Sequence, residues 1–274
     1  MIPREDNFED ILGKAIKGQG LKKASVAEEA RLSLDALEQL LAGHFDESAV
    51  RALALPLQLD PEALVRMGQS TDHPTTLCPR SIVATTTDFG DMTVNAYILW
   101  DHVSRDCAIF DTGTDAAPLL ATIKKEKLNP LAIFLTHSHA DHIHALATLK
   151  SELEVEAWSS EFEPVRGTKT FRPGDFFNAG QHFIRTRHTS GHSVGGTTFL
   201  IEGSTVQAAI VGDAIFAGSV GGIRQNYHES LESIRREILS LPDETVLCPG
   251  HGPLTSVAQE KSNNPFFPKI LPQP

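Results

Sequence analysis

The segment from Thr136 to His142 reads T-H-S-H-A-D-H and has the side chains needed to bind a metal ion. Three imidazoles and one carboxylate lie within six residues, and zinc and similar divalent metals accept these ligands. If the segment begins extended, His137 and His139 project to the same side and can converge on one point. Asp141 and the next histidine stand at an expected helix start and can face a second point nearby. The alternative is a histidine-rich loop in solvent, with Asp141 acting only as a helix cap.

Three more side chains that can bind metal stand in a similar local context further along the chain. His192 lies in T-S-G-H-S, Asp213 in V-G-D and His251 in P-G-H-G-P. Each follows an expected apolar strand and has a glycine immediately before it. Taken singly, each would be interpreted as a capping or surface residue. Four strand endings of this kind in one chain argue against coincidence and favour a shared metal site.

The elements that would position these ligands are short apolar strands alternating with helical stretches from residue 80 onward. We expect β-strands at 81–86, 94–100, 107–110, 132–135, 155–158, 182–186, 197–201, 208–211 and 245–248. We expect helices at 116–127, 141–150 and 229–241. This order predicts a mixed α/β layered domain in which sheets pack against helices.

The first part of the chain has a different pattern, because apolar residues recur at helical spacing from residue 7 to residue 68. Glycines and the pair Asp60-Pro61 divide this region into about five short helices. A polar run containing proline follows and is typical of a linker. We therefore expect two domains, a helical bundle over residues 1–72 and an α/β domain over residues 73–274.

Composition excludes several classes of protein. The chain has 274 residues, of which 41% are hydrophobic and 22% charged, so it can bury a substantial core. A formal net charge of −11 disfavours binding to nucleic acid or to an anionic membrane. No apolar run approaches the roughly 20 residues of a membrane span, and the acidic N-terminus does not resemble a secretory signal. Three separated cysteines, Cys78, Cys107 and Cys248, argue against a disulfide framework, and we expect a cytoplasmic protein.

The pattern H-x-H-x-D-H, followed by His192, Asp213 and His251, resembles the ligand set of the metallo-β-lactamase superfamily. Within that superfamily the likeness is to the glyoxalase II-like hydrolases, and it covers roughly residues 80–268. The resemblance implies a four-layer αββα sandwich, with two mixed sheets face to face and helices outside. It also implies a site for two metal ions along one edge of the sandwich.

The resemblance assigns ligands to both metal positions. One metal would be held by three histidines and the other by a carboxylate and two histidines, with one bridging aspartate: His137, His139 and His192; Asp141, His142 and His251; and Asp213. Asp141 would also orient the attacking water and is the expected catalytic residue. Asp111 in F-D-T-G resembles the family's buried acid at a strand end, which orients a ligand loop, although a turn-forming role before Gly113 is the alternative. His144 departs from the family, which usually has glycine there, and we interpret it as a residue of the helix surface.

Two cations that share a carboxylate can lower the pKa of a bound water, and one of them can polarise a carbonyl or phosphoryl oxygen. Hydrolysis of an ester-like bond by a metal-bound hydroxide is therefore the expected reaction. The likeness to glyoxalase II favours a small thioester such as an acyl-glutathione as substrate. Zinc is the metal that the ligand types favour, and iron or manganese accepts the same ligands.

The substrate class follows by elimination within the superfamily. Lactamases that cleave antibiotics usually carry another residue at the position of Asp213. Members that process nucleic acids need a basic surface, whereas residues 73–274 carry 16 Lys+Arg against 22 Asp+Glu. Only 23 residues follow His251, so we expect the short type that lacks the C-terminal glutathione-binding domain of glyoxalase II. Arg224 and Tyr227 are candidate substrate contacts, with ordinary loop residues as the alternative.

A second reaction is compatible with the same ligands. The sulfur dioxygenases of this superfamily use a single iron to oxidise a glutathione persulfide. Their segment H-x-H-A-D-H is similar to the one in this chain, which has Ala140 at the matching position. The sequence therefore does not separate this oxidation from thioester hydrolysis.

Residues 21–43 resemble a helix-turn-helix of the phage-repressor type and raise a hypothesis of another class, a DNA-binding regulator with a metal-sensing domain. The residues at that motif's core and turn positions are Leu21, Ala27, Ala30, Ser33, Leu37, Leu40 and Gly43. A DNA reader would expose Arg, Gln or Asn where its second helix starts, but Leu34, Asp35 and Ala36 stand there. Residues 1–72 also carry 8 Lys+Arg against 13 Asp+Glu, the wrong sign for phosphate contacts. We therefore expect the bundle to pack on the hydrolase, to pair two chains as a homodimer, or to cover the site.

Overall fold

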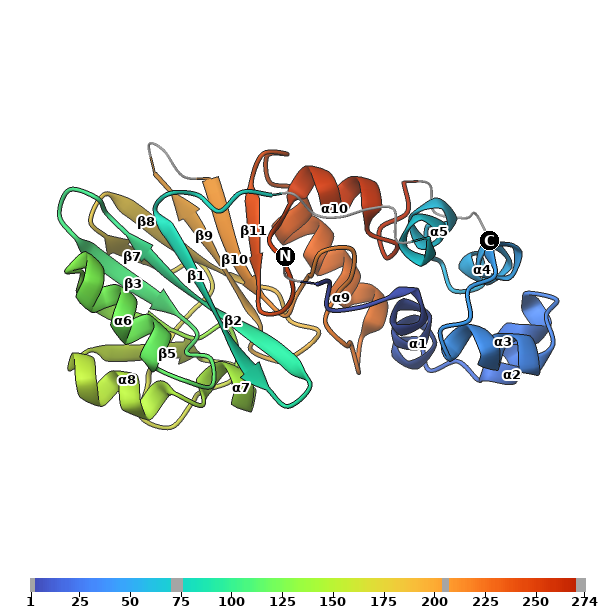
Figure 1. Ribbon diagram of the computed structural model, residues 1–274, viewed down its shortest axis with the longest axis horizontal. Helices are drawn as coiled ribbons and strands as arrows, with labels where there is room; N and C mark the ends of the chain where they lie inside the picture. The colour runs from blue at the N-terminus through green and yellow to red at the C-terminus, as the bar shows by residue number, and fades with distance from the viewer. Residues whose placement is uncertain (1–2, 70–75, 204–206, 270–274) are drawn as a thin grey trace.

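The computed structural model describes residues 3–69, 76–203 and 207–269. In this described part, two six-stranded sheets pack face to face with helices on both outer sides, and five short helices precede them (Figure 1). The four layers confirm the αββα architecture expected from the sequence. Each of the nine expected strands is observed, with ends displaced by up to three residues.

The first sheet has the strand order β1-β2-β3-β4-β5-β6. Its strands are β1 (Ile82–Phe89), β2 (Met92–Trp100), β3 (Asp106–Phe110), β4 (Asn129–Phe134), β5 (Glu156–Ser160) and β6 (Lys169–Phe171). Neighbours are antiparallel from β1 to β3 and parallel from β3 to β6. As a result, β3 and β4 end at the edge of the sheet where β2 begins.

The second sheet has the strand order β12-β11-β10-β9-β8-β7. Its strands are β7 (Phe176–Ala179), β8 (His182–His188), β9 (Thr197–Glu202), β10 (Gln207–Gly212), β11 (Val246–Pro249) and β12 (Thr255–Ser256). β10 and β11 run parallel, whereas the other neighbours are antiparallel. The strands that sequence analysis missed are β6, β7 and β12, because each has four residues or fewer and offers too short a pattern to recognise.

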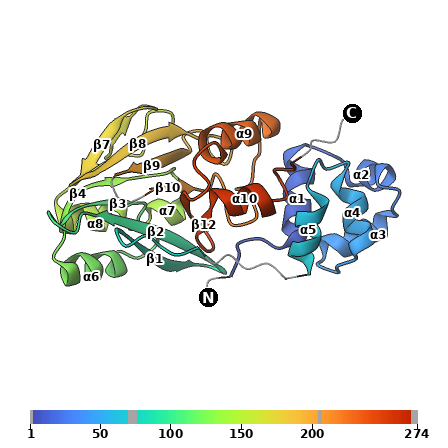
Figure 2. The same cartoon turned by 90° about the horizontal axis from the view of Figure 1, so that it is seen from above.

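Aromatic side chains fill the space between the sheets. The rings of Phe110, Phe134 and Phe199, from β3, β4 and β9, have centroids 5.2 to 5.7 Å apart. The outer face of the first sheet is covered by α6 (Ala117–Glu126) and α8 (Leu146–Leu153), and that of the second by α9 (Tyr227–Ile234) and α10 (Val257–Asn263) (Figure 2). α9 continues into a π-helical turn at Arg235–Leu239.

The single helix expected at 141–150 is wrong in one respect, because it is divided into α7 (Ala140–Ile143) and α8. The amide of Ala145 lies 3.2 Å from both the Gly113 carbonyl oxygen and Thr112 Oγ1, and donates to them. Both acceptors belong to the loop that follows β3. This tertiary contact takes the amide that a continuous helix would use, and it fixes the short α7 beside the end of β3.

The five N-terminal helices are α1 (Phe8–Gly18), α2 (Lys23–Glu29), α3 (Leu34–Leu41), α4 (Glu47–Ala54) and α5 (Pro61–Gly68). Side-chain oxygens of Ser33, Asp46 and Asp60 accept hydrogen bonds from backbone amides in the first turns of α3, α4 and α5. These caps satisfy donors that have no partner within the helix. The amphipathic helices bury their apolar faces together as a small bundle.

The bundle shares a hydrophobic core with the α/β body. Buried residues of α1, α4 and α5 belong to one cluster with residues of α9, α10 and the outer face of β10 and β11. The views of Figures 1 and 2 agree that the bundle lies beside α9 and α10. The expected boundary between residues 72 and 73 lies outside the described residues, and the division into two domains stays a prediction.

Within the ranges that the structure describes, no helix combines the length and the apolar character that crossing a bilayer requires.

Candidate metal centre

Side chains from both sheets converge where their strands end. They form overlapping groups whose ligand atoms all lie within 4.8 Å of one another: His137, His139 and His192; His137, His142 and Asp213; and Asp141, His142 and His251. These groups contain all seven side chains that the resemblance assigned to metal. The convergence follows from topology, because β4 of the first sheet and β10 and β11 of the second deliver their loops to one rim.

The first group has three imidazoles from two loops. Nδ1 of His139 lies 3.1 Å from Nε2 of His137 and 2.9 Å from Nε2 of His192. Nitrogen ligands about 2.05 Å from a tetrahedral metal would be separated by roughly 3.3 Å. The imidazole nitrogens are therefore already close to the spacing that one metal ion requires.

The second group combines a carboxylate with two imidazoles. Oδ2 of Asp141 lies 3.2 Å from Nε2 of His251 and 3.5 Å from Nε2 of His142. Asp141 and His142 come from α7, whereas His251 comes from the loop after β11. The extra short helix thus brings two neighbouring residues to a ligand from the opposite sheet.

Asp213 lies between the two groups. Its Oδ1 is 3.3 Å from Nε2 of His142, and its Oδ2 is 3.3 Å from Nε2 of His192 and 3.4 Å from Nε2 of His251. Oδ1 of Asp213 and Nε2 of His142 are both buried without a hydrogen bond in the described part of the chain. Buried polar atoms are rarely left in that state. The donor set around the Asp213 carboxylate therefore fits a divalent cation.

Two ligands of the first group, His137 and His192, are suited to metal because their imidazoles are kept neutral. Burial, together with the nearby His142, holds the pKa of His137 well below its usual range. Burial also lowers the pKa of His192. A neutral imidazole offers the lone pair that a metal binds, so these ligands need not lose a proton near neutral pH.

In the second group, protonated imidazoles balance the negative charge of the carboxylates. Burial opposes the charge on His142, but Asp213 and Asp111 raise its pKa to about 10. Burial likewise opposes the charge on His251, but Asp141 and Asp213 raise its pKa to about 11. Burial would raise the pKa of Asp213, yet the neighbouring imidazoles hold it well below the usual value. Divalent cations would replace these protons as the counter-charges.

Asp111 orients the ligand His142 by accepting a hydrogen bond from its Nδ1. Its Oδ2 accepts a hydrogen bond from Nδ1 of His142 at 2.8 Å and another from Thr136 Oγ1 at 2.8 Å, while Oδ1 accepts from the Thr136 amide at 2.7 Å. These contacts direct Nε2 of His142 toward Asp213. Asp111 therefore does more than form the turn before Gly113, and its left-handed backbone (φ 55°) serves that placement.

Sequence reasoning missed several groups that hold the ligand loops. The Thr93 carbonyl oxygen in β2 accepts a hydrogen bond from Nδ1 of His251 at 2.7 Å. Glu163 accepts from the amide of Ser138 at 3.1 Å and from that of Gly195 at 2.7 Å, so it ties two ligand loops together. A backbone carbonyl and a distant glutamate leave no local signal in the sequence. Thr136 does have one, since it begins the histidine segment.

Two glycines leave room for the ligands. A Cβ at Gly250 would lie 2.2 Å from Oδ1 of Asp213 and 2.6 Å from Cε1 of His142. A Cβ at Gly221 would lie 2.8 Å from Nδ1 of His192 and 2.0 Å from the Asp213 carbonyl oxygen. The glycine immediately before His251 is thus explained by close approach to the site.

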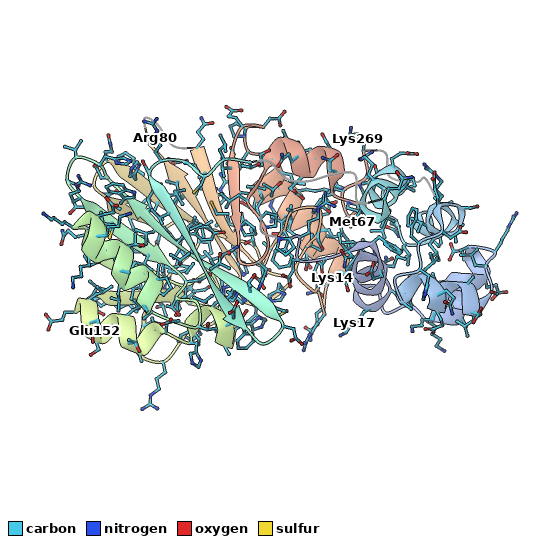
Figure 3. All side chains as sticks on the ribbon, viewed as in Figure 1. Lys14, Lys17, Met67, Arg80, Glu152 and Lys269 are labelled. Atoms are coloured by element: carbon cyan, nitrogen blue, oxygen red, sulfur yellow. The ribbon has the colours of Figure 1, made fainter. Side chains whose placement is uncertain are left out.

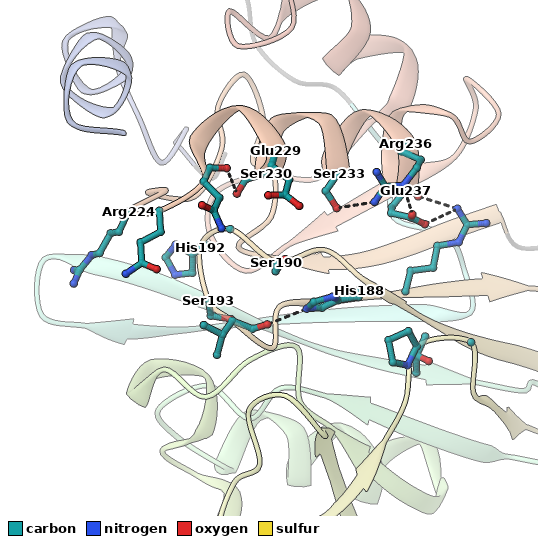
Figure 4. Close-up of a pocket in the computed structure, with 18 of the residues that line it drawn as sticks. His188, Ser190, His192, Ser193, Arg224, Glu229, Ser230, Ser233, Arg236 and Glu237 are labelled. Carbon is teal, nitrogen blue, oxygen red and sulfur yellow. Dashed lines mark hydrogen bonds and ion pairs between the residues drawn. The ribbon is translucent and has the colours of Figure 1, made fainter. Parts of the chain in front are cut away.

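Two cavities meet at His192. One, of about 870 Å³, extends along the end of β8 and beside α9, and Figure 4 shows Arg224 near His192 at one end of it. The other, of about 660 Å³, is bordered by α1, His139 and His192. Arg224 lines both cavities, as a substrate contact would.

Tyr227 and His144 lie outside these two cavities. Tyr227 is only 6% exposed and packs its ring on Gly18 of α1, so its burial joins the bundle to the α/β body, and it lines neither cavity. His144 is exposed at the end of α7 and belongs to none of the three ligand groups.

Comparisons with known proteins agree with this geometry. Hydroxyacylglutathione hydrolase GloC of Haemophilus influenzae is 32% identical over 198 residues, which are 63% of this chain and 92% of that protein. ETHE1 from Myxococcus xanthus superposes with a TM-score of 0.59 at 25% identity, over 67% of this chain and 83% of the other. The protein TTHA1623, solved in a di-iron-bound form, has a TM-score of 0.55 at 28% identity, over 66% and 99% of the two chains.

The family model described as the metallo-beta-lactamase superfamily matches residues 89–251. This range contains every member of the three ligand groups, and α1 to α5 lie before it. The fold and the family model agree. The chain therefore belongs to the metallo-beta-lactamase superfamily.

Proposed function

We propose that this protein hydrolyses a small thioester with the help of two divalent metal ions bound at the Asp213 site. The observation that carries the proposal is the position of the Asp213 carboxylate, within 3.4 Å of imidazole nitrogens from both ligand groups. His137, His139 and His192 would hold one ion, Asp141, His142 and His251 the other, and Asp213 both. Zinc is the metal that these nitrogen and oxygen ligands favour, and iron or manganese is compatible with them.

Two such cations supply a water of lowered pKa and a Lewis acid for the thioester carbonyl. Asp141 is ionised, because His251 and His142 outweigh the effect of burial and hold its pKa at about 2. Its carboxylate can therefore accept a hydrogen bond from the attacking water and orient it. Asp111 and the Thr93 carbonyl fix the rings of His142 and His251, which would hold these two ligands in place for a cation.

The substrate class rests on similarity to GloC, whose name describes hydroxyacylglutathione hydrolysis. Water added to the carbonyl carbon of an acyl-glutathione would displace the thiolate and yield an acid and a free thiol. The cavities beside His192 provide space for both halves of such a substrate.

Likeness to ETHE1 supports a second candidate, oxidation of a glutathione persulfide at a single iron. Three residues can hold one iron in either ligand group, so the side chains alone are compatible with this chemistry. The two candidates differ in metal content and in their need for oxygen.

The test combines metal analysis with two assays on the purified protein. We expect two metal ions per chain and thiol release from a panel of acyl-glutathiones, with no oxygen uptake. One iron per chain, together with oxygen consumption on glutathione persulfide and no thioester hydrolysis, would replace the main proposal with the alternative. A protein that retains neither metal nor either activity would contradict both.

A further inference from the structure

We infer that the N-terminal bundle forms one wall of the substrate cleft, and that Lys17 of α1 and Arg224 bind an anionic group on the thiol half of the substrate. The identity of the substrate as a thioester rests on the proposed function. Recognition of the anionic group rests on the cavity and its charges, so the two can be tested separately.

The 660 Å³ cavity is shared between the bundle and the metal site. His139 and His192 border it on one side, and Lys14 and Lys17 border it from α1. Figure 3 marks both lysines on α1 beside the α/β body. A ligand in this cavity would therefore touch the helical bundle and the candidate metal centre at the same time.

α1 is held firmly in this position. A Cβ at Gly18 would lie 2.4 Å from the ring of Tyr227 and 3.3 Å from the Ile223 carbonyl oxygen, so the end of α1 lies directly on the segment that contains Arg224. The Lys14 ammonium donates a hydrogen bond to the Val220 carbonyl oxygen at 2.8 Å. Lys17 and Arg224 thus come from two segments in close contact.

The ion pairs around the cavity distinguish Lys17 and Arg224 from the other cations that line it. Lys14 forms an ion pair with Asp6, and Lys23 pairs with Glu38 at 3.0 Å. Lys17 and Arg224 are exposed and form no ion pair with any described residue.

The acids that line the cavity do not pair with Lys17 or Arg224. Asp6 pairs with Lys14, whereas Glu9 and Asp10 keep their charge and form no ion pair with any described residue. Lys17 and Arg224 are therefore each open to a charge-assisted contact with an anionic group of a ligand.

The other arginines of the cavity beside α9 have acidic partners. Arg187 and Arg236 both pair with Glu237, and Arg185 pairs with Glu202. Arg224, where the two cavities meet, is the one arginine lining that cavity without an acidic partner among the described residues (Figure 4). The arginine that is open to a ligand therefore lies at the junction with the cavity of α1.

The ligand class is a thiol whose body carries carboxylates or phosphates. A peptide thiol such as glutathione and a nucleotide thiol such as coenzyme A share this chemistry. Inert thioethers of the two, S-methylglutathione and S-methyl-coenzyme A, distinguish the sources because neither is turned over. Calorimetric titration of the metal-loaded protein with each gives an affinity that is independent of catalysis.

We expect one of the thioethers to bind, and its affinity to fall about three- to tenfold in Lys17→Gln and in Arg224→Gln, as for charge-assisted contacts that are partly exposed to solvent. The affinity should also fall as salt is raised. Lys22→Gln is the matched control, because Lys22 is exposed on the same bundle and does not line the cavity. The control should bind within twofold of the unsubstituted protein.

Equal affinities in all three variants, an equal loss in Lys22→Gln, or no binding of either thioether at millimolar concentration would overturn the inference. Binding that depends on Lys17 and Arg224, in a protein that hydrolyses no thioester, would leave the inference standing and remove the proposed function.

Discussion

At the scale of single residues, the centre depends on one carboxylate shared by two sets of ligands. Asp213 is buried among the imidazoles of His142, His192 and His251, and its pKa is held well below the usual range. It is therefore ionised near neutral pH. An ionised carboxylate with one oxygen lacking a hydrogen bond is a strong ligand for a cation.

Asp213→Ala should remove the shared ligand and reduce kcat/KM at least about a thousandfold, because neither of the two proposed cations would then be fully held. Metal content per chain should fall as well, which plasma emission spectrometry would measure. His144→Ala is the matched control, since His144 is exposed and belongs to none of the ligand groups. A His144 variant as inactive as the Asp213 variant would contradict this coordination scheme.

Gly250→Ala tests the close packing around the site. The added methyl group would lie 2.2 Å from Oδ1 of Asp213, so the carboxylate or the strand end must move. We expect metal affinity to fall at least tenfold while the far-UV circular dichroism spectrum stays unchanged. Gly222→Ala is the control, because a Cβ there meets nothing within 4 Å. Unchanged metal affinity in the Gly250 variant would show that the approach is less close than described.

At the scale of elements, the bundle is fixed to the body by a buried network at α10. Glu260 accepts hydrogen bonds from Thr255 Oγ1 at 2.6 Å, from the Gly218 amide at 3.0 Å and from Asn264 Nδ2 at 2.8 Å. Asn264 also donates to the Ser219 carbonyl oxygen, and Ser219 Oγ donates to Asp6 just before α1. One buried carboxylate thus connects α10, the 218–219 turn and the start of the bundle.

Glu260 should make stability depend on pH. Burial raises its pKa from 4.5 to about 7 in the folded protein, despite hydrogen bonds that favour the ionised form. Between pH 4.5 and 7 the unfolded chain loses this proton first, so the free energy of unfolding should fall by up to about 3 kcal/mol as pH rises. Glu260→Gln removes this contribution, and urea unfolding across that range would measure the difference from the unsubstituted protein.

The exposed Glu152 on α8 provides the comparison for this effect. Glu152→Gln removes one carboxyl group from the surface and controls for that loss as such. If the Glu260→Gln curve were parallel to that of the unsubstituted protein, the Glu260 carboxyl group would not hold its proton up to neutral pH.

DNA binding by the bundle stays a hypothesis, as does pairing of two chains through it. α3 begins with Leu34, which is 48% exposed, and Asp35, while Lys23 of α2 is paired with Glu38 of α3. These side chains add no free positive charge to the surface that a DNA reader would use. A salt-titrated gel shift of the full chain would test the hypothesis directly.

At the scale of the whole molecule, the candidate metal centre joins layers that are also linked by hydrophobic packing and by hydrogen bonds. Its ligands come from loops of both sheets, and β2 of the first sheet holds the 249–252 segment through hydrogen bonds from Asn95. The bundle packs on the outer face of the second sheet. Metal binding should therefore stabilise the fold as a whole.

Removal of metal should lower the melting temperature. An ion present at a hundred times its Kd adds about 2.7 kcal/mol, which for a chain of this size corresponds to roughly 5 to 10 °C. Differential scanning calorimetry before and after chelation would measure this shift. Asp213→Ala should show a much smaller shift, and an equal shift in that variant would mean that the stabilising ion is bound elsewhere.

The sequence by itself determined the type of fold and the candidate ligands. Strand-forming runs and the spacing within T-H-S-H-A-D-H are local properties, and local properties can be recognised without a structure. The sequence did not predict the break between α7 and α8, because that break depends on a hydrogen bond from Ala145 to the loop after β3. The burial of Tyr227 was not predictable for a similar reason, since it depends on the docking of α1.

Only the tertiary structure decided which groups surround the ligands and what faces the cleft. Glu163 and the Thr93 carbonyl hold ligand loops from positions far away in the chain. Lys17 and Arg224 line the same cavity although about two hundred residues separate them in the sequence. Contacts between distant segments are set by how complete elements pack, and this information is spread over the whole core. The metal ligands could be recognised in the sequence because their residue types and spacing are local. The groups that surround them could not, because packing between distant segments brings those groups together.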